Sequence, residues 1–116
     1  MDTSEFLNAK KSFTWKSLIP MDFFMRSPSK AIEEIKNGEI KGRILVICKN
    51  LQEAKFCAFL LNAKTSRPFV CIDEVHHNPI PSEIDHLVMD FNSVDILRRN
   101  EHTPFDVCIL WFHQYE

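Results

Sequence analysis

Three stretches of this chain, at positions 43–48, 69–72 and 105–112, are rich in β-branched residues and, apart from Arg43 and Asp106, continuously apolar. A strand with one solvated face alternates apolar and polar residues, whereas a strand covered on both faces is apolar throughout. None of the runs approaches the roughly 20 residues that a membrane-spanning helix needs. The pattern therefore predicts a buried, mainly parallel sheet in an α/β domain and no membrane span.

Two segments between these runs carry helix signals. At 27–38, Ser27 is a suitable N-cap, Pro28 fits the first turn and Gly38 fits a left-handed C-cap. The next helix begins after Asn50, with Glu53 at the capping-box position. Its apolar residues recur at steps of three and four, and we expect Phe56, Phe59 and Leu60 to widen the same buried face, which comprises Leu51, Ala54, Cys57, Ala58 and Leu61.

A third helix is predicted to open at 82–85 because Ile84, Leu87, Val88 and Phe91 keep a helical period. Asn100 or Pro104 would end it. Upstream, the β-forming stretch 12–19 could add a strand that Pro20 stops. We therefore expect one domain at 27–116 in the order α, β, α, β, α, β, preceded by an arm or added strand at 1–26.

Composition excludes several classes of protein. Apolar residues make up 45% of the 116 residues, which argues against global disorder. The net charge of −2 gives no field that would attract nucleic acid. The first residues lack the basic start and apolar stretch of a secretory signal, so a cytosolic or nuclear setting is expected. The four cysteines lie inside apolar runs and are interpreted as buried, reduced thiols: Cys48, Cys57, Cys71 and Cys108.

The chain has only two glycines, Gly38 and Gly42. Neither a P-loop nor a dinucleotide-binding glycine motif is present, so no glycine-rich cradle for phosphate can form.

The block 42–61 combines a buried strand with a helix that carries Glu53-Ala54 and apolar residues. It resembles the fourth conserved motif of superfamily-two helicases, which opens the second RecA-like domain of DEAD-box RNA helicases. The helix before it and the Phe105-Asp106-Val107 strand stand in the matching order, so the resemblance covers about residues 27–112. It implies a small RecA-like three-layer domain, with a sheet of three to five strands flanked by helices.

The departures from that family concern catalysis. The last strand leads into Trp111 and the residues 112–116 instead of the Thr-Asp and glycine segment of working helicases, and the arginine-rich motif has no counterpart. The chain is similar to the degenerate helicase-C-like domains of Yb-type Tudor proteins in the PIWI-interacting RNA pathway. This resemblance implies no enzymatic activity, no cofactor, and a place in cytoplasmic or perinuclear RNA-silencing granules.

The string Asp73-Glu74-Val75-His76 looks like the DEVH form of the helicase second motif, in which the carboxylates hold magnesium. Without a phosphate loop, an ordinary polar loop is the favoured interpretation. A metal-dependent hydrolase built on Asp73, Glu74 and His76 is a second alternative. Separately, this loop and His77 could form an N/O metal site with His86 and Asp90, four residues apart on one helical face, although solvated loop histidines are the favoured interpretation. Nucleophilic catalysis by Cys71 beside His76 or His77 is disfavoured, because a buried thiol has a raised pKa.

RNA binding is the first alternative function. The resemblance places Lys49 and Asn50 near an RNA backbone, and Arg43 and Lys55 are further candidates. Backbone contacts alone would give weak, salt-sensitive binding to single-stranded RNA.

Aromatic residues exceed what a small core must hold, and an open sheet edge attracts partners. The favoured function is therefore a non-catalytic module that self-associates or docks protein partners. The interface residues predicted for it are Phe13, Trp15, Phe23, Phe24, Trp111 and Phe112.

Overall fold

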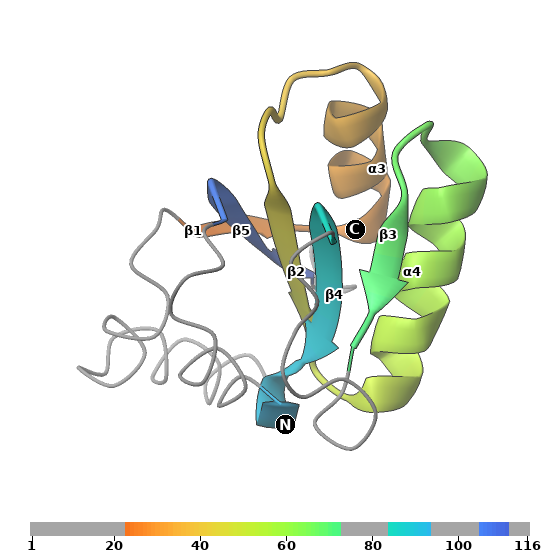
Figure 1. The fold of residues 1–116 in the computed structure, drawn as a ribbon, viewed down its shortest axis with the longest axis vertical. Coiled ribbons are helices and arrows are strands. Elements are labelled where there is room, and N and C mark those ends of the chain that lie inside the picture. Colours follow the sequence, from red (N-terminus) through yellow and green to blue (C-terminus); the bar gives the residue numbers. More distant parts are fainter. Residues whose placement is uncertain (1–22, 73–83, 94–104, 112–116) are drawn as a thin grey trace.

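The computed structural model describes residues 23–72, 84–93 and 105–111. These residues form a single parallel sheet with two helices (Figure 1). In chain order the elements are β1 (Phe23–Arg26), α3 (Pro28–Lys36), β2 (Ile44–Cys48), α4 (Leu51–Lys64), β3 (Phe69–Cys71), β4 (His86–Asp90) and β5 (Val107–Trp111). The predicted α/β domain with a mainly parallel sheet is confirmed, with five strands among the described residues.

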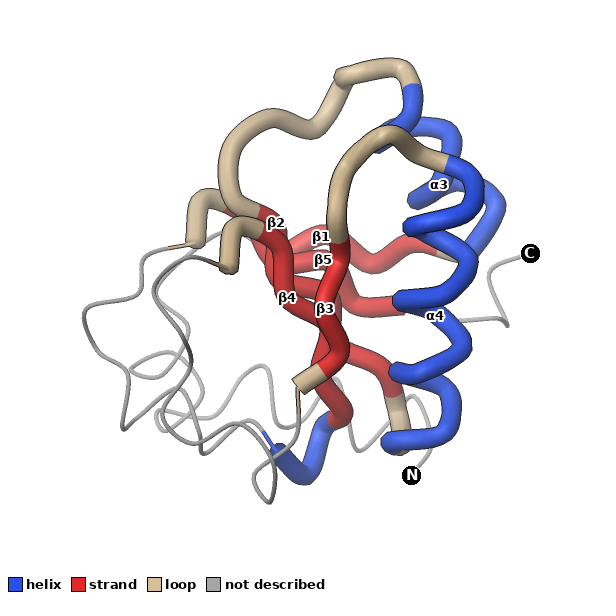
Figure 2. The backbone as a smooth tube through the Cα atoms, turned by 45° about the vertical axis from the view of Figure 1, so that its right-hand side comes forward, coloured by secondary structure: helices blue, strands red, loops and turns tan. Residues whose placement is uncertain are grey.

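The strand order is β1-β5-β2-β4-β3, and every neighbouring pair is parallel. The connection through α3 passes over β5, and the connection through α4 passes over β4, in the same direction across the sheet. Because such crossovers are right-handed, both helices lie on one face. Figure 2 shows α3 and α4 side by side on that face.

The two predicted helices form for the predicted reasons. The Ser27 side chain accepts a hydrogen bond from the backbone N–H of Lys30 at 3.4 Å, and Gly38 follows the helix with φ of 75°. Asn50 caps α4 by accepting from the backbone N–H of Glu53 at 2.8 Å.

Both faces of the sheet are buried, as the continuous apolar runs predicted. The face that carries the helices includes Val46, Val88 and Ile109, each 0% exposed, with Trp111 at 1%. The opposite face contributes a second core cluster: Leu45, Ile47, Ile72, Leu87, Met89, Phe105, Cys108 and Leu110.

The predicted third helix is wrong where the structure describes it. Residues 86–90 form β4, which lies between β2 and β3, and a short 3₁₀ turn follows at 91–93. The spacing of Ile84, Leu87, Val88 and Phe91 fits a helix, but a run of five buried residues carries no period of its own. The segment is a strand because β2 and β3 pair with it on either side. The remainder of that predicted helix lies outside the described residues.

The expected broad apolar face of α4 is also wrong. Ala54, Cys57, Ala58 and Leu61 pack on the sheet, whereas Phe56 and Phe59 are 55% and 66% exposed on the other side of the helix. Leu60 is half-buried. The stretch 12–19 lies outside the described residues, and β1, at the end of the segment 1–26, is a strand of the same sheet.

Neither helix among the described residues has the length and hydropathy of a membrane span.

Candidate functional site

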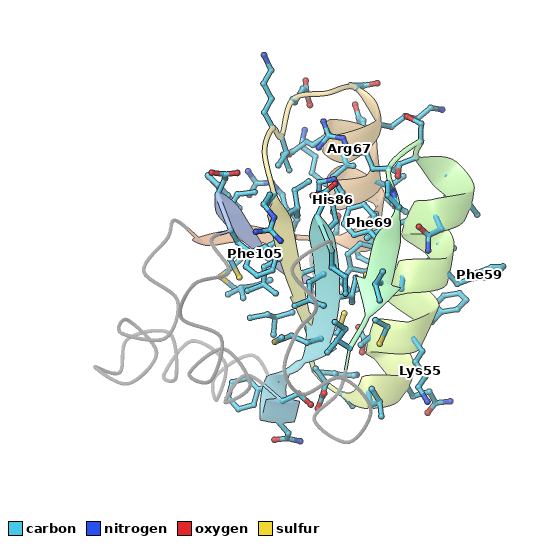
Figure 3. All side chains as sticks on the ribbon, in the orientation of Figure 1. Lys55, Phe59, Arg67, Phe69, His86 and Phe105 are labelled. Carbon is cyan, nitrogen blue, oxygen red and sulfur yellow. The ribbon has the colours of Figure 1, made fainter. Side chains whose placement is uncertain are left out.

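The four predicted RNA-binding residues are not brought together. Arg43 precedes β2 at the amino edge of the sheet, whereas Lys49 and Asn50 follow β2 at its carboxyl edge. Arg43 and Lys49 are six residues apart along the strand, which is about 20 Å. Lys55 lies one turn into α4, on its outer side (Figure 3).

The contacts of Arg43 are structural. Its backbone N–H donates to Asp106 Oδ2 at 2.7 Å, and its guanidinium donates to the Ile84 carbonyl. The same guanidinium stacks 5.1 Å from the centre of the Phe105 ring. Arg43 therefore ties together the segments that precede β2, β4 and β5.

At the carboxyl edge, the polar groups satisfy one another locally. Lys49 Nζ lies 3.8 Å from Glu53 Oε2, and the Asn50 side chain caps the helix. Asp90 ends β4 beside Cys48 and is 6% exposed. Its carboxylate accepts from Ser93 Oγ at 2.5 Å and from the Asn92 N–H at 3.2 Å. A phosphate group needs available cations, whereas this edge presents the carboxylate of Asp90 and a lysine that is already paired with Glu53.

The predicted metal ligands do not share a helical face. His86 and Asp90 begin and end β4, which separates them by about 13 Å along the strand. This expectation is wrong because the segment is a strand. Among the described residues, no group of three potential ligands gathers. Asp73, Glu74, His76 and His77 lie outside the described residues.

His86 has a structural role instead. Its Nδ1 accepts the backbone N–H of Ile44 at 3.2 Å, and its ring stacks on Phe69 with centroids 5.0 Å apart. Burial lowers the pKa of His86, and the nearby Arg67 and Arg43 lower it further, while Asp85 opposes them. The lowered pKa and the accepting Nδ1 both favour the neutral imidazole.

All four cysteines are free thiols, as predicted, and three of them are buried, with Cys71 half-buried in the short strand β3. Burial raises the pKa of the Cys48 thiol, and the neighbouring Cys57 raises it further. A thiol with a raised pKa is a poor nucleophile.

The predicted aromatic interface is only partly placed. Trp111 is 1% exposed in the core beneath the helices, so its prediction as an interface residue is wrong. Phe24 on β1 is 38% exposed. The side chain of Phe23, together with Phe13, Trp15 and Phe112, lies outside what the structure describes.

Sequence reasoning missed the outer stripe of α4, which consists of the exposed residues Gln52, Lys55, Phe56, Phe59 and Ala63. Figure 3 shows Lys55 and Phe59 pointing away from the sheet. The signal was present in the sequence: at 100° per residue, Phe56 and Phe59 fall opposite the stripe formed by Ala54, Cys57 and Leu61.

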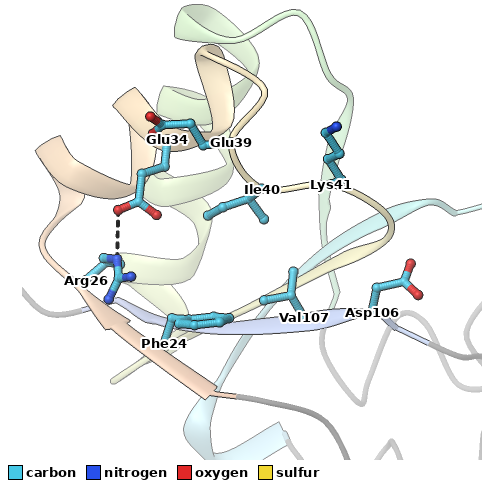
Figure 4. A pocket seen from close by; sticks show the side chains of 8 residues that line it. All are labelled: Phe24, Arg26, Glu34, Glu39, Ile40, Lys41, Asp106 and Val107. Atoms are coloured by element: carbon cyan, nitrogen blue, oxygen red, sulfur yellow. Dashed lines mark hydrogen bonds and ion pairs between the residues drawn. The ribbon is translucent and has the colours of Figure 1, made fainter.

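It also missed a pocket of about 420 Å³ between β1, α3 and the loop that follows α3 (Figure 4). The lining combines three apolar and five charged side chains: Phe24, Arg26, Glu34, Glu39, Ile40, Lys41, Asp106 and Val107. The lining segments are 24–26, 34–41 and 106–107, so no single sequence motif announces the pocket.

Comparison of the chain with models of protein families, with curated proteins and with solved structures found no match.

Proposed function

We propose that this chain is a non-catalytic protein-interaction module that self-associates through the outer stripe of α4. The observation that carries the proposal is the exposure of Phe56 and Phe59, at 55% and 66%, on a helix whose opposite side is fully packed. Side chains three positions apart on a helix are neighbours, so the two rings form one apolar patch. A helix that is apolar on two opposite sides is typically covered on both.

The occupant we propose is a second copy of this chain, with its α4 antiparallel. A twofold axis midway between Phe56 and Phe59 places each Phe56 against the partner's Phe59, and each Gln52 against the partner's Ala63. The stripe has a single charge, Lys55. In this arrangement the two Lys55 positions are displaced by about 7 Å along the helix axis, so like charges do not face each other directly.

The size of the patch sets the expected strength of association. At about 200 Å² per phenylalanine, the exposed ring surface is roughly 240 Å² per copy, against about 800 Å² per partner in a standard interface. The dimer is therefore expected to be weak, with a dissociation constant on the order of 100 µM or above.

RNA binding is less well supported by the same surface. A ring can stack on a base, but strong backbone binding needs several cations, and Lys55 is the sole charge of the stripe. Lys49 lies beside Glu53. The helicase-C-like resemblance adds a setting to the proposal, in which the module assembles larger RNA-silencing or RNA-granule proteins in the cytoplasm.

Sedimentation velocity over a concentration series on the order of 10 µM to 1 mM tests the proposal. We expect a rising average mass that Phe59→Asp abolishes. Ser66→Asp is the matched control, because it adds the same charge at an exposed site beyond the end of α4 and leaves the dimer intact.

A wild-type chain that stays monomeric throughout would refute self-association, and a dimer unaffected by Phe59→Asp would refute the assigned surface. Fluorescence anisotropy with labelled single-stranded RNA decides between the two classes of partner. RNA binding that Phe59→Asp removes, with no dimer, would assign the stripe to RNA.

A further inference from the structure

The pocket beside β1 exists because α3 crosses over β5 on its way from β1 to β2. The helix does not cover the part of the sheet nearest the edge, where Phe24 remains 38% exposed. Figure 4 shows Phe24 and Val107 on the sheet side of the pocket and Ile40 facing them from the loop. These three side chains give the pocket apolar walls. Its volume of about 420 Å³ falls within the usual range for small-molecule sites.

The charges at the α3 end of the pocket are paired within the protein. Arg26 Nε lies 2.9 Å from Glu34 Oε1, and Lys30 Nζ lies 3.8 Å from the same oxygen. The Arg26 guanidinium also lies 5.3 Å from the centre of the Phe24 ring. This contact shows that the ring face accepts a cation. Among the lining residues at this end, Arg26 and Glu34 balance each other, and Lys30 does not line the pocket.

The other end of the pocket carries Asp106 and Lys41 (Figure 4). Asp106 is exposed, and its Oδ2 accepts the Arg43 N–H at 2.7 Å, so Oδ1 is the oxygen available to a ligand. With Arg26 and Glu34 paired, the remaining lining charges are the carboxylates of Glu39 and Asp106 against the ammonium of Lys41. The excess of carboxylate favours a cationic ligand over an anionic one.

We infer that this pocket binds an organic cation with a short aliphatic stem, the chemical class that includes lysine and arginine side chains. The stem lies between Phe24, Ile40 and Val107, and the cationic head reaches Asp106. The pocket is separate from the outer stripe of α4, so this inference stands or falls independently of the proposed self-association.

Amide chemical-shift titration of the full chain by NMR tests the inference with two pairs of probes, each matched in size and differing in charge. The first pair is pentylammonium and its neutral analogue 1-pentanol. The second is a capped Ala-Ala-Lys-Ala-Ala peptide and the same peptide with norleucine in place of lysine. We expect the cationic member of either pair to shift the amides of Phe24, Ile40 and Val107, and the neutral member to bind more weakly.

Tighter binding of the lysine peptide than of pentylammonium would identify a protein side chain as the source of the cation, and equal binding would identify a free amine. Neutral probes that bind as tightly as the cations, shifts confined to other residues, or the absence of shifts would overturn the inference.

Two variants change the charge at the ligand end in opposite directions. Asp106→Asn keeps an acceptor for the Arg43 N–H and should weaken binding of the cation roughly twofold to fivefold. Lys41→Gln should tighten it by a similar factor. If Asp106→Asn does not fold, Glu39→Gln replaces it, with a weaker loss expected. Variants that leave cation binding unchanged would refute the assigned orientation of the ligand.

Discussion

The two ends of the sheet are held together in different ways. At the amino end, hydrogen bonds join residues far apart in the chain: Arg43 to Asp106 across 63 positions, Ile44 to His86 across 42, and Arg67 to the Ile40 carbonyl across 27. At the carboxyl end, the side-chain bonds of Asn50 and Asp90 span two or three positions. The amino end therefore fixes the tertiary arrangement, whereas the carboxyl end satisfies its polar groups locally.

This contrast bears on where function is sought. In open α/β sheets ligands commonly bind at the carboxyl edge, and the RNA-binding expectation for Lys49 and Asn50 concerned that edge. Here the carboxyl edge holds a helix cap, an ion pair and a buried Asp90. The two features without an evident structural role, the outer stripe of α4 and the pocket beside β1, lie away from it.

The largest effect is expected from Gly42→Ala at the amino end. Gly42 has φ of 87°, and an added Cβ would lie 2.3 Å from Asp106 Oδ2. We expect a loss of about 2–3 kcal/mol in the free energy of unfolding, measured by urea denaturation. Gly38→Ala is the control, because Gly38 has φ of 75° with no atom within 4 Å of the added Cβ, and should cost about 1 kcal/mol. Equal losses in the two variants would show that the Asp106 contact is unimportant.

Asn62→Ala should cost about 2 kcal/mol, also at the amino end. The Asn62 amide accepts the Phe69 N–H at 2.7 Å and donates to the Phe69 carbonyl at 2.8 Å, which fixes the start of β3 against α4. Asn62→Asp keeps the acceptor and loses the donor, so denaturant unfolding should place it between the wild type and Asn62→Ala. If Asn62→Ala left the free energy of unfolding unchanged, the greater importance of the amino end for the tertiary arrangement would be contradicted.

At the carboxyl end, Asn50→Ala should cost about 1 kcal/mol, because one N-cap is lost. Asn50→Asp keeps the capping oxygen and should restore most of the stability. If Asn50→Ala proved as destabilising as Gly42→Ala in the same denaturation experiment, the carboxyl end would be no less critical to the fold than the amino end.

A weaker, pH-dependent effect is expected at His86. The pKa of His86 is lowered in the folded chain from the ordinary 6.5, so the unfolded chain binds the proton more readily. Above about pH 6.5, His86 is neutral in both states and does not affect the free energy of unfolding. As the pH falls from about 6.5 toward the pKa of the folded state, protonation of the unfolded chain lowers the free energy of unfolding. When the pH is lowered from about 7 to about 5, the midpoint temperature of thermal unfolding should fall less for His86→Asn than for the wild type. If the substitution did not change how the unfolding temperature depends on pH, His86 would not be the source of that dependence.

The smallest effect is expected from Lys49→Ala. Lys49 is 52% exposed and lies 3.8 Å from Glu53, and an exposed pair at this spacing contributes no more than about 0.5 kcal/mol. Denaturant unfolding should be nearly unchanged. A loss above about 1 kcal/mol, twice the upper expectation, would reveal a long-range role for the carboxyl end.

The local structure follows from the amino-acid sequence. Ser27 and Asn50 begin their helices because each side chain reaches a backbone N–H three positions ahead, a contact that depends on no other part of the chain. The runs 43–48, 69–72 and 105–112 were correctly predicted to contain strands: β2 and β5 are buried throughout, whereas Val70 and Cys71 of β3 are half-buried. A sheet covered on both faces tolerates such apolar sequence.

Other features depend on how the strands assemble. Residues 86–90 form a strand because β2 and β3 pair with them from both sides, and a run of five buried residues has no period to indicate this. The placement of Asp106 against Gly42, and of the pocket beside β1, depends on the strand order β1-β5-β2-β4-β3. Local hydrogen bonds can be inferred from spacing along the chain, but contacts across 40 to 60 positions exist only once the sheet is assembled.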